Sequence, residues 1–87
     1  MHEMSLMNDL MKKIDTIAQD QGGTNVVGVH VWLGALTHMS PDHFREHFKE
    51  MAKGTLAQGA HLEIITDDDP KNPNAQSILL QSVEVDD

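Results

Sequence analysis

Histidine is the residue type in this sequence with the widest capacity for chemistry. The chain has six histidines among 87 residues, and histidine is the commonest nitrogen ligand for late transition metals. Two arrangements matter: one at the amino terminus and one on a predicted helix. Metal binding is therefore the chemistry that this sequence favours.

The first three residues can form a nitrogen-rich metal site. His2 directly follows Met1. A bulky second residue generally blocks removal of the initiator methionine, so we expect Met1 to keep its free amine. The amine, the amide nitrogen of His2 and the His2 imidazole then form fused five- and six-membered chelate rings. Nitrogen donors in one plane suit Ni(II) and Cu(II) but not Zn(II), and Glu3 adds an amide nitrogen or a carboxylate. The alternative is an ordinary frayed terminus.

The other histidines give weaker signals. His43 and His47 are four residues apart on a predicted helix and share a face, so they can chelate zinc or nickel. The stronger interpretation places both on the solvent face, because two histidines without a third ligand form only a weak site. His30 alternates with the apolar residues of a predicted strand and is expected on the open face of a sheet. His38 and His61 are expected to be isolated surface residues.

The inventory of catalytic residues is poor. None of the four serines lies in a G-x-S-x-G context, and there is no glycine-rich phosphate loop. The acidic run at residues 67–69 lacks the spacing of a calcium-binding hand and is typical of a solvated loop. We therefore predict that the chain is not an enzyme.

Composition excludes several other classes of protein. The net charge is −8, with 14 acidic and 6 basic residues, which argues against binding to nucleic acid or to an anionic membrane. There is no cysteine, so disulfides, thiolate nucleophiles and cysteine-based zinc sites are excluded. The sequence has neither a long apolar run nor a secretory signal. A cytoplasmic location is the expectation.

Two helices are predicted from apolar spacing and capping residues. The first covers residues 6–21, with Ser5 as its N-cap and Gly22 and Gly23 as its stop. Its apolar stripe comprises Leu6, Met7, Leu10, Met11, Ile14, Ile17 and Ala18. The second begins at Ser40, Pro41 and Asp42 and ends near residue 53. Its buried stripe comprises Phe44, Phe48, Met51 and Ala52.

Three extended segments complete the prediction. Residues 25–36 form a strand in which Val27, Val29, Val31 and Leu33 face the core. Residues 60–66 and 77–85 form two more strands, and a polar loop with two prolines lies between them. The predicted fold is α+β: a single domain, residues 1–87, with two helices packed on one face of a small mixed sheet.

Several segments resemble the HypA/HybF nickel metallochaperones. The matching stretches follow in the family's order and are residues 1–6 (MHEMSL), 29–36 (VHVWLGAL), 40–48 (SPDHFREHF), 54–64 (GTLAQGAHLEI) and 78–85 (ILLQSVEV). Members of this family usually carry a cysteine-based zinc domain between the last two strands. Here that interval is only residues 67–75, so the resemblance implies the nickel-binding domain alone, with no zinc. An acidic residue that some relatives place near the nickel corresponds to Ser40, which leaves the fourth ligand open.

The resemblance implies a function in nickel handling. The chain would bind Ni(II) transiently at Met1, His2 and Glu3 and deliver it during [NiFe]-hydrogenase maturation. The implied partners are a nickel-handling GTPase and the hydrogenase large subunit. The alternative is a metal-free adaptor that keeps the partner-binding surface but does not deliver nickel. A homodimer formed by exchange of the final strand is also an open alternative.

Overall fold

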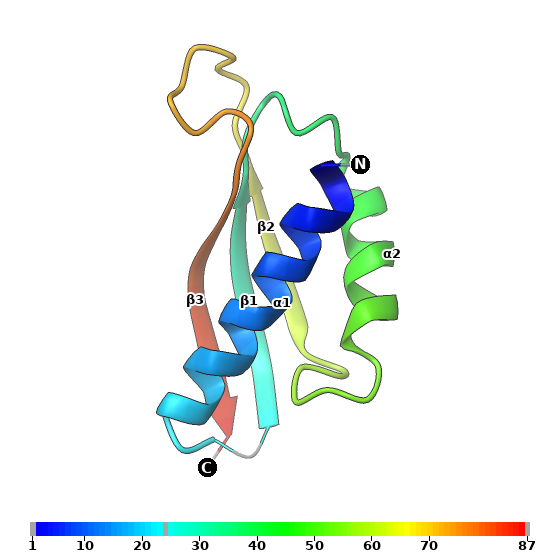
Figure 1. The fold of residues 1–87 in the computed structure, drawn as a ribbon, viewed down its shortest axis with the longest axis vertical. Helices are drawn as coiled ribbons and strands as arrows, with labels where there is room; N and C mark the ends of the chain where they lie inside the picture. The colour runs from blue at the N-terminus through cyan, green and yellow to red at the C-terminus, as the bar shows by residue number, and fades with distance from the viewer. Residues whose placement is uncertain (1, 24, 87) are drawn as a thin grey trace.

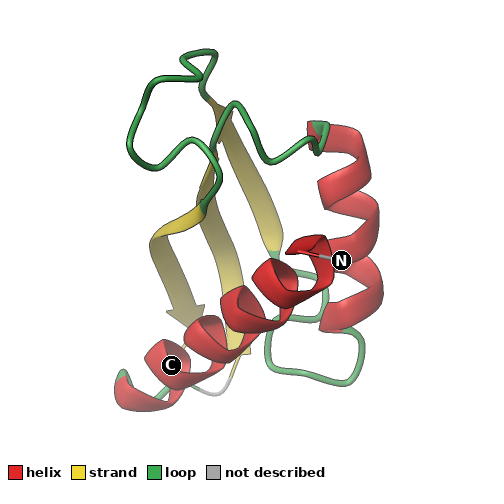
Figure 2. Cartoon of the chain, turned by 45° about the horizontal axis from the view of Figure 1, so that its top comes forward, coloured by secondary structure: helices red, strands yellow, loops and turns green. Residues whose placement is uncertain are grey.

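The computed structural model describes residues 2–23 and 25–86, and side chains within helices and strands from residue 4 onward. Its elements follow the order α1 (His2–Asp20), β1 (Asn25–Leu33), α2 (Pro41–Ala52), β2 (His61–Thr66) and β3 (Ile78–Asp86). The sheet order is β2-β1-β3; β1 is parallel to β2 and antiparallel to β3. Both helices lie on the same side of this sheet (Figures 1 and 2). The predicted α+β architecture is confirmed.

Helix α1 begins earlier than predicted. It starts at His2, so Ser5 is an exposed residue within the helix and the predicted N-cap is wrong. Residues 2–6 contain no glycine or proline and include good helix formers, so the helix extends through them without needing a serine cap. Its carboxyl end agrees with the prediction. Gly22 has a φ of 69°, and the Gly23 N–H donates to the Ala18 carbonyl over 3.0 Å.

Strand β1 departs from simple alternation near its start. Val27 is 44% exposed, whereas Val26 is 1% exposed, so the prediction that Val27 faces the core is wrong. The cause is an irregularity in the pairing of β1 with β3 between Val26 and Gly28, which shifts the side chains on one side of it. Beyond it Val29, Val31 and Leu33 are buried as predicted.

Strand β1 also ends earlier than predicted, at Leu33 instead of residue 36. The Gly34 N–H donates to the Ser77 carbonyl over 3.0 Å, and the Leu36 N–H donates to the Ala75 carbonyl over 2.8 Å. The backbone then turns, with the Thr37 N–H donating to the Gly34 carbonyl. These bonds attach the β2–β3 connection to the end of β1.

Helix α2 follows the predicted signals closely. The Ser40 hydroxyl accepts a hydrogen bond from the His43 N–H over 3.1 Å and caps the helix, and Pro41 occupies the first turn. On the other side of α2, the Arg45 guanidinium donates to the Leu62 carbonyl of β2 over 2.9 Å. This bond fixes the rotation of α2 relative to the sheet.

The hydrophobic core lies between the two helices and the covered face of the sheet. It contains buried residues from α1, β1, α2 and β2, with Phe44 and Met7 among the largest fully buried side chains. The buried stripes are Met7, Leu10, Ile14 and Ala18 on α1 and Phe44, Phe48 and Ala52 on α2. Both stripes match the predicted faces. This packing holds the start of α1 against α2 and so positions the candidate site.

The connection between β2 and β3 contains turns and no helix or strand. The Asp67 N–H donates to the Leu33 carbonyl over 3.0 Å, and the Asp69 carboxylate accepts from the Lys71 N–H over 2.9 Å. The strand that follows, β3, pairs with β1 of its own chain. The predicted polar loop is therefore confirmed, and its hydrogen bonds run both within the loop and to the end of β1.

Candidate metal centre

The predicted nickel ligands lie at the extreme start of the chain. Met1 and the side chains of His2 and Glu3 fall outside the described residues. What is described is the backbone from His2 onward, which is already helical. The N–H groups in the first turn of a helix have no acceptor within the helix. The amides next to the predicted ligands therefore make no intrahelical hydrogen bond that metal binding would break.

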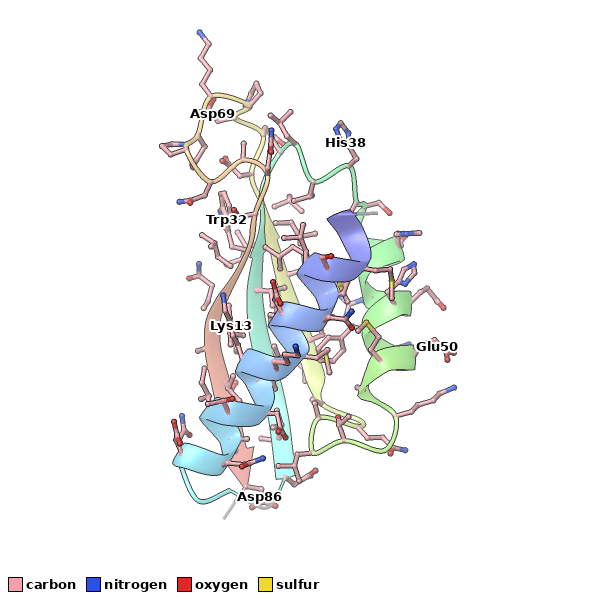
Figure 3. All side chains as sticks on the ribbon, viewed as in Figure 1. Lys13, Trp32, His38, Glu50, Asp69 and Asp86 are labelled. Atoms are coloured by element: carbon pink, nitrogen blue, oxygen red, sulfur yellow. The ribbon has the colours of Figure 1, made fainter. Side chains whose placement is uncertain are left out.

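The surroundings of the α1 start come from α2 and from the loop that precedes it. In both views the first turn of α1 lies beside α2 (Figures 1 and 2). The loop from β1 to α2 borders a hollow of about 290 Å³ whose lining includes His38, Ser40 and Asp67. His38 is exposed on this loop, as predicted, and lies above the start of α1 in Figure 3.

Ser40 stands where the resemblance implies an acidic residue near the metal. Its hydroxyl accepts the His43 N–H and caps α2. The residue therefore has a clear structural role, and this role accounts for its type without any metal contact. The position of Ser40 in the sequence therefore gives no reason to assign it as a metal ligand.

The pair His43 and His47 is brought together as the spacing predicts. Their ring centroids are 4.5 Å apart with an interplanar angle of 55°. His43 is exposed and His47 is half-buried. Within the described part of the chain, no group of three or more histidine and acidic residues is arranged to hold a metal ion.

The open face of the sheet carries two histidine–glutamate pairs that sequence reasoning missed. His30 Nε2 lies 2.9 Å from Glu84 Oε1, and this contact joins β1 to β3. His61 Nε2 lies 2.8 Å from Glu63 Oε1 on β2, so the expectation that His61 is isolated is wrong. The i, i+2 spacing of His61 and Glu63 on one strand face is the signal that could have identified this second pair.

The electrostatics of this face are visible in Glu63. The hydrogen bond from His61 and the charge of that imidazole hold the pKa of the Glu63 carboxyl below its ordinary value of 4.5. The charges of His30 and Arg45 act in the same direction, and desolvation opposes them. Both histidines of the open face thus contact a carboxylate through Nε2.

No helix in the described ranges is long and apolar enough to cross a bilayer.

Comparison with known proteins decides the family. Residues 1–70 match the family described as "Hydrogenase/urease nickel incorporation, metallochaperone, hypA". The chain belongs to the HypA family. It is 39% identical over 66 residues to the hydrogenase maturation factor HypA of Acidithiobacillus ferrooxidans (strain ATCC 53993 / BNL-5-31), which covers 76% of this chain and 58% of that protein. It is 32% identical over 62 residues to HypA of Methanosarcina mazei, covering 71% of this chain and 45% of that protein.

Solved HypA structures share the fold. The solution structure of the Ni metallochaperone HypA from Helicobacter pylori superposes with a TM-score of 0.75 at 14% identity, covering 95% of this chain and 96% of that one. A second HypA solution structure gives a TM-score of 0.71 at 18% identity. The chain spans little more than half the length of the A. ferrooxidans relative.

Proposed function

We propose that this HypA-family chain binds Ni(II) at its amino terminus and delivers it during [NiFe]-hydrogenase maturation. The ligands are the Met1 amine, the amide nitrogen and imidazole of His2, and Glu3. The observation that carries the proposal is the Met-His-Glu start of a chain whose first 70 residues match a family of nickel metallochaperones.

The start of α1 supports this ligand set. Planar nitrogen coordination requires amide nitrogens that have lost their protons. Because the first-turn N–H groups of a helix have no intrahelical acceptor, such a loss leaves the hydrogen bonds of α1 intact. The positive end of the helix dipole also favours the negative charge of a deprotonated amide.

A terminal site suits transfer of the metal. An incoming protein can displace the ligands one at a time, because they come from a single chain end. We propose that the ion passes to or from a nickel-handling GTPase and then to the hydrogenase large subunit. The chain would work in the cytoplasm as a single domain, with residues 67–75 in place of the zinc domain and with no zinc of its own.

The test is a calorimetric titration of Ni(II) into untagged chain that begins at Met1. His2→Ala removes the imidazole and is expected to weaken binding at least about 10-fold, because a chelate ring is lost. His61→Ala is the matched control, since it removes another histidine on the open face of the sheet, and it should leave the affinity unchanged.

Two results would count against the proposal. Equal affinities of the His2→Ala variant and the unsubstituted chain would remove His2 from the ligand set. A failure of the unsubstituted chain to bind Ni(II) would favour the metal-free adaptor instead.

A further inference from the structure

The outer edge of the sheet at β3 has no neighbouring strand within the described part of the chain. The sheet order β2-β1-β3 places β3 at one end, where it pairs with β1 alone. In both views β3 lies at the outside of the molecule, with β1 on its inner side (Figures 1 and 2). The outward N–H and C=O groups of its first half, residues 78–82, are therefore accessible to another strand.

The opposite edge of the sheet, at β2, is protected by a helix. The Arg45 guanidinium of α2 donates to the Leu62 carbonyl of β2 over 2.9 Å. A side chain thus occupies a backbone acceptor of this edge strand, and covering an edge is one way in which proteins limit further pairing. Among the described residues, no side chain bonds to the backbone of residues 78–82 in this way. The contrast identifies β3 as the accessible edge.

A hollow of about 620 Å³ lies beside this edge, between the middle of α1 and the first half of β3. It forms because α1 crosses the sheet obliquely: its carboxyl end lies near the end of β3, whereas its first turn lies beside α2 (Figures 1 and 2). Its lining includes Lys12, Lys13 and Ile17 of α1 and Leu79, Leu80 and Gln81 of β3. Both leucines are only half-buried, so the hollow exposes apolar surface.

An extra residue in β3 lies at the same place. Val31 pairs with Leu80 and His30 pairs with Ser82, so Gln81 has no partner in β1. Gln81 is exposed and lines the hollow. Because such a bulge bends the strand, regular pairing with a further strand can extend over only a short length of β3.

The charge at this hollow is opposite to that of the chain. The net charge is −8 and only six residues are basic, yet the adjacent residues Lys12 and Lys13 both border the hollow. Both are exposed, and neither forms an ion pair or hydrogen bond with another described residue. Figure 3 shows Lys13 on the side of α1 that faces β3. Two ammonium groups beside apolar surface favour a ligand that is both acidic and apolar.

We propose that the β3 edge is a docking site for an extended segment of a partner protein in which acidic and apolar side chains alternate. The segment adds a strand to β3. Because alternate side chains of a strand point to opposite faces, its carboxylates lie on the helix side, beside Lys12 and Lys13. Its apolar side chains lie on the open face beside Leu79, which pairs there with Trp32.

The charge also argues for a different protein as the occupant. A second copy of this chain would bring a further net charge of −8 to the interface, and self-repulsion opposes such a dimer. A short acidic segment of another protein meets the two lysines without this cost. The proposal does not depend on nickel binding.

The test is a titration of the full chain with a capped synthetic peptide of about eight residues in which valine and glutamate alternate. The backbone amides are followed in ¹H–¹⁵N spectra. We expect the largest shifts at residues 12–17 and 78–82 and little change in β2. Binding should weaken as NaCl is added, because salt screens charges at a surface.

Charge reversal tests the two lysines. Lys12→Glu combined with Lys13→Glu should weaken peptide binding at least about 10-fold, because attraction becomes repulsion. Lys49→Glu combined with Lys71→Glu is the matched control, since it changes the net charge equally at exposed lysines that do not line the hollow. The control should change the affinity less than about 2-fold, and circular dichroism checks that both variants keep the parent fold.

A second peptide tests strand addition itself. Methylation of all its backbone nitrogens keeps the side chains and charges but removes every N–H group that could donate to β3. We expect this peptide to bind at least about 10-fold more weakly than the unmethylated one.

The outcomes decide the proposal. Shifts in both segments that are lost with the reversed lysines and with the methylated peptide support it. Absence of binding by the unmethylated peptide, equal binding by the methylated one, or an equal effect of the two pairs of lysine substitutions overturns it. A dimer of the free chain in sedimentation experiments that dissociates on reversal of Lys12 and Lys13 would also overturn it, because a second copy would then occupy the edge.

Discussion

At the residue scale, the clearest electrostatic feature is the contact between His61 and Glu63 on the open face of the sheet. The imidazole lowers the pKa of the Glu63 carboxyl from its ordinary value of 4.5. A carboxyl with a lowered pKa in the folded state contributes stability above its unfolded pKa, and the contribution is lost as the pH falls through the folded pKa. The contact, whose ionic part exists only while the imidazole is protonated, therefore contributes stability above the pKa of Glu63 and ceases to do so as the pH falls through it.

The prediction is that His61→Ala raises the pKa of Glu63 toward 4.5. The Glu63 side-chain carboxyl carbon followed by NMR during an acid titration measures it. His43→Ala, which replaces an exposed histidine on α2, is the control and should leave the Glu63 titration curve unchanged. A Glu63 titration curve that does not move would show that the histidine has no part in the shift.

The sequence predicted only part of the two histidine–glutamate contacts on the open face of the sheet. The placement of His30 on the open face followed from its alternation with the apolar residues of β1. Its contact with Glu84 did not, because the two residues are far apart in sequence and meet only through the antiparallel register of β1 and β3. The amino-terminal ligands stay a prediction, because their side chains fall outside the described residues.

At the element scale, the junction of β1 with the β2–β3 connection depends on one glycine. A Cβ atom added to Gly34 would lie 2.2 Å from the Ala75 carbonyl oxygen, so any side chain here forces two backbone segments apart. Gly34→Ala is expected to lower the free energy of unfolding by about 1–3 kcal/mol. Urea denaturation followed by circular dichroism measures this change. Gly59→Ala is the comparison variant, because its added Cβ meets open space while its φ of 80° strains the backbone. It therefore measures the cost of backbone strain without a steric clash. A Gly34→Ala midpoint equal to that of the parent would contradict the close approach.

The cap of α2 gives a second prediction at this scale. Ser40→Ala removes the acceptor for the His43 N–H and should cost about 1 kcal/mol of stability. Ser40→Asp is the matched variant, because aspartate is as effective an N-cap as serine. Its unfolding temperature should equal that of the parent chain. Thermal unfolding compares the three chains. An alanine variant as stable as the aspartate variant would show that the Ser40 cap does not stabilise the protein.

Helix ends and buried helix faces could be predicted where neighbouring residues in the sequence determine them. The cap of α2, the glycine stop of α1 and the apolar stripes of both helices follow from spacing and residue type, and all are present. The start of α1 and the side-chain pattern at the start of β1 were predicted wrongly. Serine is tolerated inside a helix whose neighbours form helix well, and the irregularity between Val26 and Gly28 arises from pairing with β3, which no local pattern reveals.

At the scale of the whole molecule, two helices and three strands form a scaffold that holds the first described turn of α1 in place. Helix α1 packs its buried stripe on the sheet, and its first turn lies beside α2 (Figure 2). The proposed metal site adjoins this turn of α1. The fold could be predicted because the apolar patterns and the family resemblance agree, whereas metal binding depends on an end that the fold does not determine.

The central claim is that the free amine and backbone of the chain end bind nickel. The most direct measurement is the visible absorption spectrum of untagged chain during titration with Ni(II) at neutral and mildly alkaline pH. The account predicts one equivalent of planar nickel, more of it as the pH rises because the amide must lose its proton, and none when Met1 is acetylated. A spectrum of six-coordinate nickel alone, or one unchanged by acetylation, would contradict it.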